Sequence, residues 1–200
     1  MNALDLASVI PGFPEPTADS QGVFRDCLEA LSAPGRCVEM CTAIDAVPGI
    51  HPASLVLLLA MLDQDTNLWL SPSAAAAAAT FRFHTGCRLV DDPAAAHFAL
   101  AANPQELPAL EVFAGGTDEH PERSATLLLQ VPAFAGARWL LTGPGIESSI
   151  RVAAPDLGDG FVAQWQRNRG RFPRGIDLFL VCGRTLCGLP RTTDIASERG

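Results

Sequence analysis

Residues 172–193, FPRGIDLFLVCGRTLCGLPRTT, contain two apolar runs separated by a short polar turn. The runs are Ile176–Cys182 and Leu186–Pro190, and the turn between them is Gly183-Arg184-Thr185. This pattern predicts a β-hairpin near the C-terminal end of the chain. Because a hairpin joins antiparallel strands, we expect at least one antiparallel pair in the sheet that contains it.

Upstream of this hairpin, helical and strand patterns alternate along the chain. Helices are predicted from Asp19 or Ser20 to Pro34-Gly35, over Ala53–Leu62, from Ser71-Pro72 through Ala74–Ala79 to near Gly86, over Gln105–Phe113 and over Asp159–Arg167. Strands are predicted over Cys37–Cys41, Asn67–Ser71, His97–Ala101, Ala125–Val131 and Arg138–Thr142. An alternating order that ends in an antiparallel pair predicts an α/β fold with a mixed sheet flanked by helices.

The organisation along the chain is simple. Residues 1–18 are rich in proline and are predicted to form an extended N-terminal arm. Residues 19–200 contain no interior linker and no internal repeat, so they are predicted to form a single α/β domain.

Composition excludes several classes of function. A net charge of −8 argues against generic nucleic-acid binding, which needs a basic surface. All 14 basic residues are arginine, so no side chain can form a Schiff base and lysine-bound pyridoxal phosphate (PLP) is excluded. The longest apolar run, Leu55–Leu62, is too short to cross a bilayer, and we expect a cytoplasmic protein without a secretory signal.

Metal-binding patterns are weak. Cys37 and Cys41 would lie about 13 Å apart along a strand, too far for one zinc ion. Cys182 and Cys187 flank the predicted turn and are expected to be cross-strand neighbours, but two thiols do not complete a site. Asp63 can pair with Asp65 to hold Mg²⁺, or the two can cap an ordinary turn. We expect no metal site, and reduced cysteines that are mostly buried.

Three places are candidates for binding a ligand or partner. The turn Thr142-Gly143-Pro144-Gly145 can present N–H groups to an anion, or it can simply end a strand tightly. Arg191 beside Thr192 can contact an anion or partner, or it can form an ion pair at the hairpin edge. His84 follows the alanine-rich helix and can bind a ligand, or it can cap that helix at its C-terminus. No catalytic residues are predicted.

Taken in order, these segments resemble one family, the H subunit of the carbon–phosphorus (C–P) lyase core complex (PhnH) of bacterial phosphonate use. The stretches that carry the resemblance are Phe24-Arg25, Leu31–Gly35, Leu62–Thr66, Trp69-Leu70, Phe83–Thr85, Ser124–Val131, Leu141–Ile146, Phe172-Pro173, Gly175–Leu178 and Pro190–Thr193. The resemblance covers nearly the full length of the chain. It rests on the order of the motifs, because no single motif encodes a reaction.

The resemblance implies a fold related to the large domain of PLP-dependent transferases, without that cofactor. It implies a subunit that assembles with the G, I and J subunits. Because an apolar subunit surface without its partners tends to pair symmetrically, we expect a homodimer when the chain is alone. With the G and I subunits and the L protein, the family supports transfer of ribose 5-triphosphate from ATP to methylphosphonate, releasing adenine. The later C–P cleavage, which uses an iron–sulfur cluster and S-adenosylmethionine, belongs to the J subunit. The alternative is a direct nucleotide or phosphonate binder that uses the 142–145 turn and Arg191.

Overall fold

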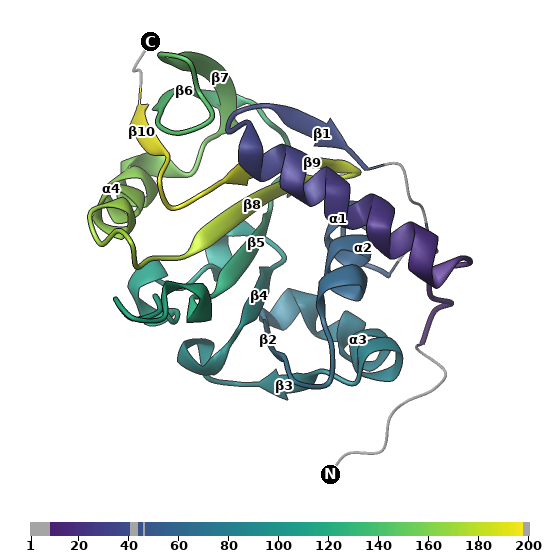
Figure 1. The fold of residues 1–200 in the computed structure, drawn as a ribbon. Helices are drawn as coiled ribbons and strands as arrows, with labels where there is room; N and C mark the ends of the chain where they lie inside the picture. Colours follow the sequence, from purple (N-terminus) through teal and green to yellow (C-terminus); the bar gives the residue numbers. More distant parts are fainter. Residues whose placement is uncertain (1–8, 41–43, 46, 198–200) are drawn as a thin grey trace.

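The computed structural model describes residues 9–40, 44–45 and 47–197. Its centre is a seven-stranded sheet in the order β1-β9-β8-β5-β4-β2-β3 (Figure 1). The strands are β1 (Cys37–Glu39), β2 (Asn67–Leu70), β3 (Arg88–Val90), β4 (Phe98–Ala101), β5 (Thr126–Gln130), β8 (Asp177–Cys182) and β9 (Thr185–Leu189). The five strands from β8 to β3 run parallel. On the other side of β8, β9 pairs antiparallel with β8, and the edge strand β1 pairs antiparallel with β9. The predicted mixed sheet and its C-terminal hairpin are therefore confirmed.

A second, smaller sheet is entirely antiparallel. It has the order β10-β6-β7, with β6 at Gly136–Thr142, β7 at Ile150–Pro155 and β10 at Asp194–Ser197. Figure 1 places it beside α4 (Gly158–Arg169), and α4 also contacts β10 directly. The indole N–H of Trp165 donates to the carbonyl of Thr193 just before β10 (2.9 Å), which fixes the helix to this sheet.

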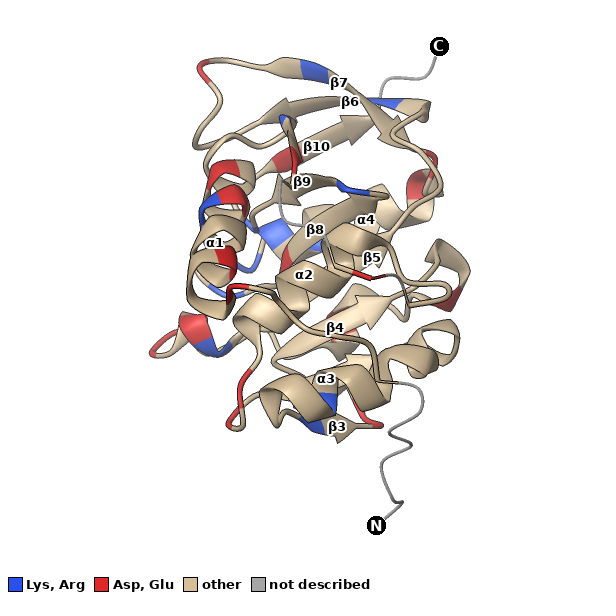
Figure 2. Cartoon of the chain, turned by 90° about the vertical axis from the view of Figure 1, so that its right-hand side faces the viewer, with Lys and Arg blue, Asp and Glu red and all other residues tan. Residues whose placement is uncertain are grey.

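Three helices form a group that is packed on the large sheet. These are α1 (Pro16–Ser32), α2 (Pro52–Met61) and α3 (Ala78–Thr85), and α2 contacts both of the others. Charged residues lie on the loops and on the outer side of α1 (Figure 2). The buried side chains between the helices and the sheet are mostly apolar. Within the described residues, no helix is long and apolar enough to cross a membrane.

Alternate residues of the central strands enter two separate hydrophobic cores. Leu128 and Phe179 pack with the first three helices, in a core that includes Val23 and Leu58. Their chain neighbours Leu129 and Leu180 pack with α4 and the small sheet, in a core that includes Trp165. This period-two pattern is the expected behaviour of strands that are covered on both faces.

Several predicted boundaries were wrong. Helix α1 begins at Pro16, inside the predicted arm, because proline is favoured in a first turn; Asp19 then accepts the backbone N–H of Glu15. The predicted Gln105–Phe113 helix is replaced by two 3-10 turns, η4 (Pro104–Glu106) and η5 (Leu110–Val112). Pro108 lies between them, and a proline has no N–H for a continuous helix.

The predicted pairing of two cysteines was also wrong. Across the β8–β9 hairpin, Cys182 lies opposite Thr185, and Cys187 lies opposite Leu180. The cross-strand cysteine neighbour of Cys187 is Cys37, on β1. The prediction for Cys41 falls outside the described residues. The alanine-rich segment is a 3-10 stretch, η2 (Pro72–Ala77), followed by α3, and it ends at Gly86 as predicted, in a left-handed conformation.

Candidate functional site

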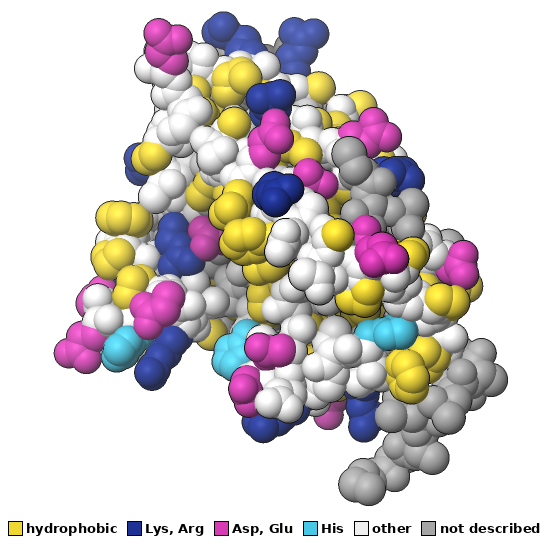
Figure 3. Space-filling model, turned by 45° about the vertical axis from the view of Figure 1, so that its right-hand side comes forward, with side chains coloured by type: hydrophobic (Ala, Val, Ile, Leu, Met, Phe, Trp, Pro, Cys, Tyr) yellow, Lys and Arg dark blue, Asp and Glu magenta, His cyan; other side chains and the backbone are white. Residues whose placement is uncertain are grey.

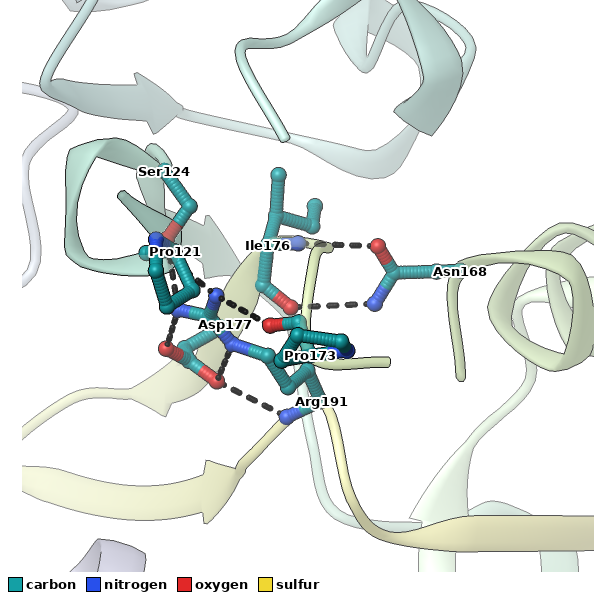
Figure 4. A network of polar contacts seen from close by, with 7 residues as sticks. All are labelled: Pro121, Ser124, Asn168, Pro173, Ile176, Asp177 and Arg191. Atoms are coloured by element: carbon teal, nitrogen blue, oxygen red, sulfur yellow. Dashed lines mark hydrogen bonds and ion pairs between the residues drawn. The ribbon is translucent and has the colours of Figure 1, made fainter. Parts of the chain in front are cut away.

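Arg191 lies just after β9, where its guanidinium faces the first residue of β8 (Figure 4). Its Nε and one terminal nitrogen bond the two carboxylate oxygens of Asp177, and its backbone N–H adds a third bond to that carboxylate. The remaining N–H groups donate to the carbonyls of Pro121 and Pro173 and to the hydroxyl of Ser124. Only 14% of the Arg191 side chain is exposed.

This geometry uses all five N–H donors that a guanidinium possesses. The ion pair at the hairpin edge, one of the two interpretations of Arg191, is thus present. A shallow pocket lies beside it, lined in part by Phe172 and Thr192. An anion in that pocket would have to compete with Asp177 for donors that are already occupied.

The turn after β6 packs tightly between two distant segments. A Cβ on Gly143 would lie 2.8 Å from the carbonyl oxygen of Thr192, and one on Gly145 would lie 2.3 Å from that of Ser32. Both glycines also have positive φ, at +134° and +84°. The turn therefore joins the end of α1 to residues 190–193, and glycine is required there for both space and backbone conformation.

The structure brings together five of the six predicted binding residues and separates the sixth. Thr142 pairs with Asp194 in the small sheet, Gly143 and Gly145 follow it, and Thr192 lies against Gly143 with Arg191 next to it. His84 lies elsewhere, with its Nε2 bonded to the carbonyl of Ile10 (2.8 Å). That bond ties the segment before α1 to α3, which neither of the interpretations of His84 anticipated.

A cavity of about 450 Å³ opens at the carboxyl ends of the parallel strands, the usual ligand position in open α/β sheets. Gln130 ends β5 beneath it and makes three bonds, from the His51 N–H (2.7 Å) and to the carbonyls of Gly49 (2.9 Å) and Ala102 (3.2 Å). His51 Nδ1 in turn lies 3.2 Å from both the Val181 carbonyl and the Gly183 N–H.

No sequence pattern indicates this cavity, because His51 and Gln130 lie 79 positions apart and neither belongs to a motif. A buried Gln at the end of an apolar strand was the one available signal. Asp156 carries the formal charge here, and none of the described lining residues is Lys or Arg. Such a lining suits a neutral polar ligand and gives no counter-charge to a triphosphate.

No group of three or more His, Cys, Asp or Glu residues in the described part of the chain lies close enough to hold a metal ion. Charged side chains are also dispersed. Figure 3 shows acidic, basic and apolar side chains intermixed over one face, with no continuous basic patch among the residues described there.

Comparison with known proteins gives a consistent result. A family model described as "Bacterial phosphonate metabolism protein (PhnH)" matches residues 11–196. The chain belongs to this family. Within it, a Rhizobium meliloti (strain 1021) protein named alpha-D-ribose 1-methylphosphonate 5-triphosphate synthase subunit PhnH is 36% identical over 189 residues, covering 93% of this chain and 94% of that protein.

A second relative carries a related name. The putative C-P lyase subunit protein HtxG of Stutzerimonas stutzeri is 33% identical over 176 residues, covering 88% of this chain and 85% of that protein. Both matches span most of each chain, so the resemblance to the PhnH family stated from the sequence motifs is confirmed.

Proposed function

We propose that this chain is a subunit of a C–P lyase core complex. With partner subunits, it supports transfer of ribose 5-triphosphate from ATP to methylphosphonate, with release of adenine. The observation that carries the proposal is the match over 94% of a relative named as a subunit of the corresponding synthase. No catalytic residue is assigned to this chain.

The internal contacts of the chain favour an assembly role. Arg191 and Gln130 each line one of the two pockets described above, and the side chains of both hold parts of the fold together. The cavity at the strand ends offers no cation among its described residues for a triphosphate. A triphosphate at this cavity would therefore need basic groups from partner subunits.

The partners we propose are the G, I and J subunits, with the L protein acting in the same reaction, in the cytoplasm. Alone, the chain is proposed to form a homodimer, because large apolar side chains are exposed: Phe24 (47%), Leu28 (51%) and Phe172 (64%). Light scattering at micromolar concentration tests whether the chain forms a homodimer, and a monomer would contradict the proposal.

We also propose that the fold is related to the large domain of PLP-dependent transferases, with the lysine that would bind the cofactor absent.

Reconstitution tests the main proposal. The G and I subunits and the L protein are mixed with ATP and methylphosphonate, with and without this chain, and adenine is measured by chromatography. We expect adenine release to require the chain, and the chain alone to release none. Turnover by the isolated chain, or equal turnover when it is omitted, would contradict the proposal.

Direct nucleotide or phosphonate binding is the second candidate function. One observation favours it: the backbone of Thr192 lies against Gly143, so the 142–145 turn and the segment that carries Arg191 are neighbours in space. This function predicts heat on titration of the isolated chain with ATP or methylphosphonate, and a loss of about 1.5–3 kcal/mol of binding in Arg191→Ala. The assembly role predicts no heat with either ligand.

A further inference from the structure

Two cysteines face each other across the antiparallel pair β1–β9. The register places Cys37 directly opposite Cys187, and the N–H of Met40 donates to the carbonyl of Arg184 three positions further along. Hydrogen-bonded and non-hydrogen-bonded pairs alternate along such a ladder, so Cys37 and Cys187 form a non-hydrogen-bonded pair. The Cα atoms of such pairs lie about 4.5 Å apart, inside the span of roughly 4.4–6.8 Å that a disulfide bridges.

The two thiols differ in environment and in reactivity. Cys37 is exposed at the edge of the sheet, and a hydrogen bond from the buried Cys187 lowers its pKa to about 7. The pKa of Cys187 is raised, first by that same hydrogen bond and then by burial and by the charge of Cys37. The lowered pKa increases the thiolate fraction of the outer sulfur near neutral pH, while the buried partner stays protonated.

We propose that Cys37 and Cys187 are a redox modification site, in which Cys37 reacts with a peroxide and Cys187 then closes a disulfide across β1 and β9. In the first step the Cys37 thiolate attacks one peroxide oxygen, the O–O bond breaks, and the departing hydroxide takes a proton to become water. In the second step the Cys187 sulfur attacks the sulfenic sulfur of Cys37, and the hydroxyl group leaves as a second water. One peroxide is reduced, and two thiols become one disulfide.

The second step is favoured by a change at Cys187. Once Cys37 is a neutral sulfenic acid, it no longer accepts a hydrogen bond as a thiolate or repels a second negative charge. Two of the causes that raise the pKa of Cys187 then vanish, while burial remains. The backbone N–H of Gly35 also bonds this sulfur and favours its thiolate form.

The other described cysteines lack this arrangement. Cys27 and Cys87 are buried, and burial raises the pKa of each thiol, to about 12 for Cys27. Cys182 is half-buried, with its Sγ 3.4 Å from the carbonyl of Pro132. Cys182 therefore supplies a matched control, since it lies on the adjacent strand without a thiol opposite to it.

The test treats the reduced full-length chain with stoichiometric hydrogen peroxide and then maps disulfides by mass spectrometry. Trypsin leaves Cys187 in the peptide Thr185–Arg191 and Cys182 in Gly175–Arg184, so the two are distinguished directly. Cys37 and Cys41 share one peptide, and a Cys41→Ser variant separates them. We expect loss of two free thiols per chain, a mass decrease of about two hydrogens and a 37–187 link, all reversed by dithiothreitol.

Variants give further outcomes. Cys187→Ser should leave Cys37 as a sulfenic acid that dimedone traps, and Cys37→Ser should abolish peroxide consumption by this pair. Cys182→Ser should behave as the parent protein.

The pH dependence of the reaction gives a second test. The rate of reaction with peroxide should rise through about pH 7 in the parent protein, and this rise should move to higher pH in Cys187→Ala. A link to any other cysteine, an intermolecular link through Cys37, or two thiols that survive peroxide would overturn the proposal.

Discussion

The guanidinium of Arg191 joins segments that are far apart in the chain, because its partners Pro121, Ser124, Pro173 and Asp177 precede it by 14 to 70 positions. Removing it leaves the Asp177 carboxylate, 24% exposed, without its charge partner. Arg191→Ala should therefore lower the free energy of unfolding by about 1.5–3 kcal/mol, the scale of hydrogen bonds to a charged group. Arg191→Lys should recover part of the lost stability, because it keeps a positive charge beside Asp177. The recovery should be incomplete, because an ammonium lacks the planar fork of the guanidinium.

Urea denaturation followed by circular dichroism measures the effect of these variants. Arg36→Ala is the matched control, since Arg36 pairs with Glu29 in an exposed salt bridge that should contribute no more than about 1 kcal/mol. Equal stability of Arg191→Ala and the parent protein would show that this network does not hold the fold together.

Asn168 shows why a glycine follows the Phe172-Pro173 segment. Its side-chain amide accepts the N–H of Ile176 (2.8 Å) and donates to the carbonyl of the same residue (3.0 Å), as a neighbouring strand would (Figure 4). Gly175 has a φ of +126°, and a Cβ there would lie 2.9 Å from the Asn168 oxygen. Glycine is required here because the amide that it accommodates is a tertiary contact, which no local sequence pattern records.

At the scale of elements, the most deeply buried strands were predicted close to their observed positions, whereas two of the exposed strands were missed. β4, β5, β8 and β9 have apolar sequences because the cores cover them, and each was expected close to its observed position. β3 is largely exposed, and half of the residues of β7 are exposed too, so neither has a clear apolar pattern. They are strands because a neighbour supplies their hydrogen bonds, and a pattern of single residues does not record that neighbour.

Glu106 links two elements through its carboxylate. It bonds the N–H and hydroxyl of Ser73 at the start of η2, while its own N–H donates to the side chain of Asn103. Hydrogen bonds from Ser71 and Ser73 are the largest causes that lower its pKa from 4.5 to about 2. A depressed pKa means that the folded chain favours the ionised form, so this contribution is complete above about pH 4.5 and is lost as the pH falls towards about 2.

Glu106→Gln should therefore be less stable than the parent protein at neutral pH, and the difference should shrink between about pH 4.5 and pH 2. Melting temperatures of both proteins across this range measure it. Glu147→Gln serves as a control, because Glu147 lies in the separate turn after β6. A difference that stays constant down to pH 2 would show that the carboxylate bonds do not stabilise the link.

At the scale of the whole molecule, the cavity at the strand ends could not be predicted. Its lining comes from the ends of several strands and from the segments that follow them, including 102–105 and 155–157. Segment 102–105 follows the parallel strand β4, whereas 155–157 follows β7 of the small sheet, so the cavity depends on strand order and on the placement of both sheets. The sequence indicated that the sheet is mixed, but it did not give the order that places β5 between β4 and β8.

The two cores offer a test of whether residues 19–200 unfold as a single domain. The chain has three tryptophans, Trp69, Trp139 and Trp165, and all of them lie in the core that contains α4 and the small sheet. Tryptophan fluorescence therefore reports on that side of the sheet, whereas far-ultraviolet circular dichroism reports on every helix and strand. The central strands contribute to both cores, so both signals should show the same unfolding midpoint in urea.

Leu58→Ala removes side-chain packing from the opposite core, at a cost of about 2–5 kcal/mol in the free energy of unfolding. If the chain unfolds as one domain, this substitution should lower the fluorescence midpoint as far as the dichroism midpoint. A fluorescence transition that ignores this substitution would divide the chain into two independently folding parts.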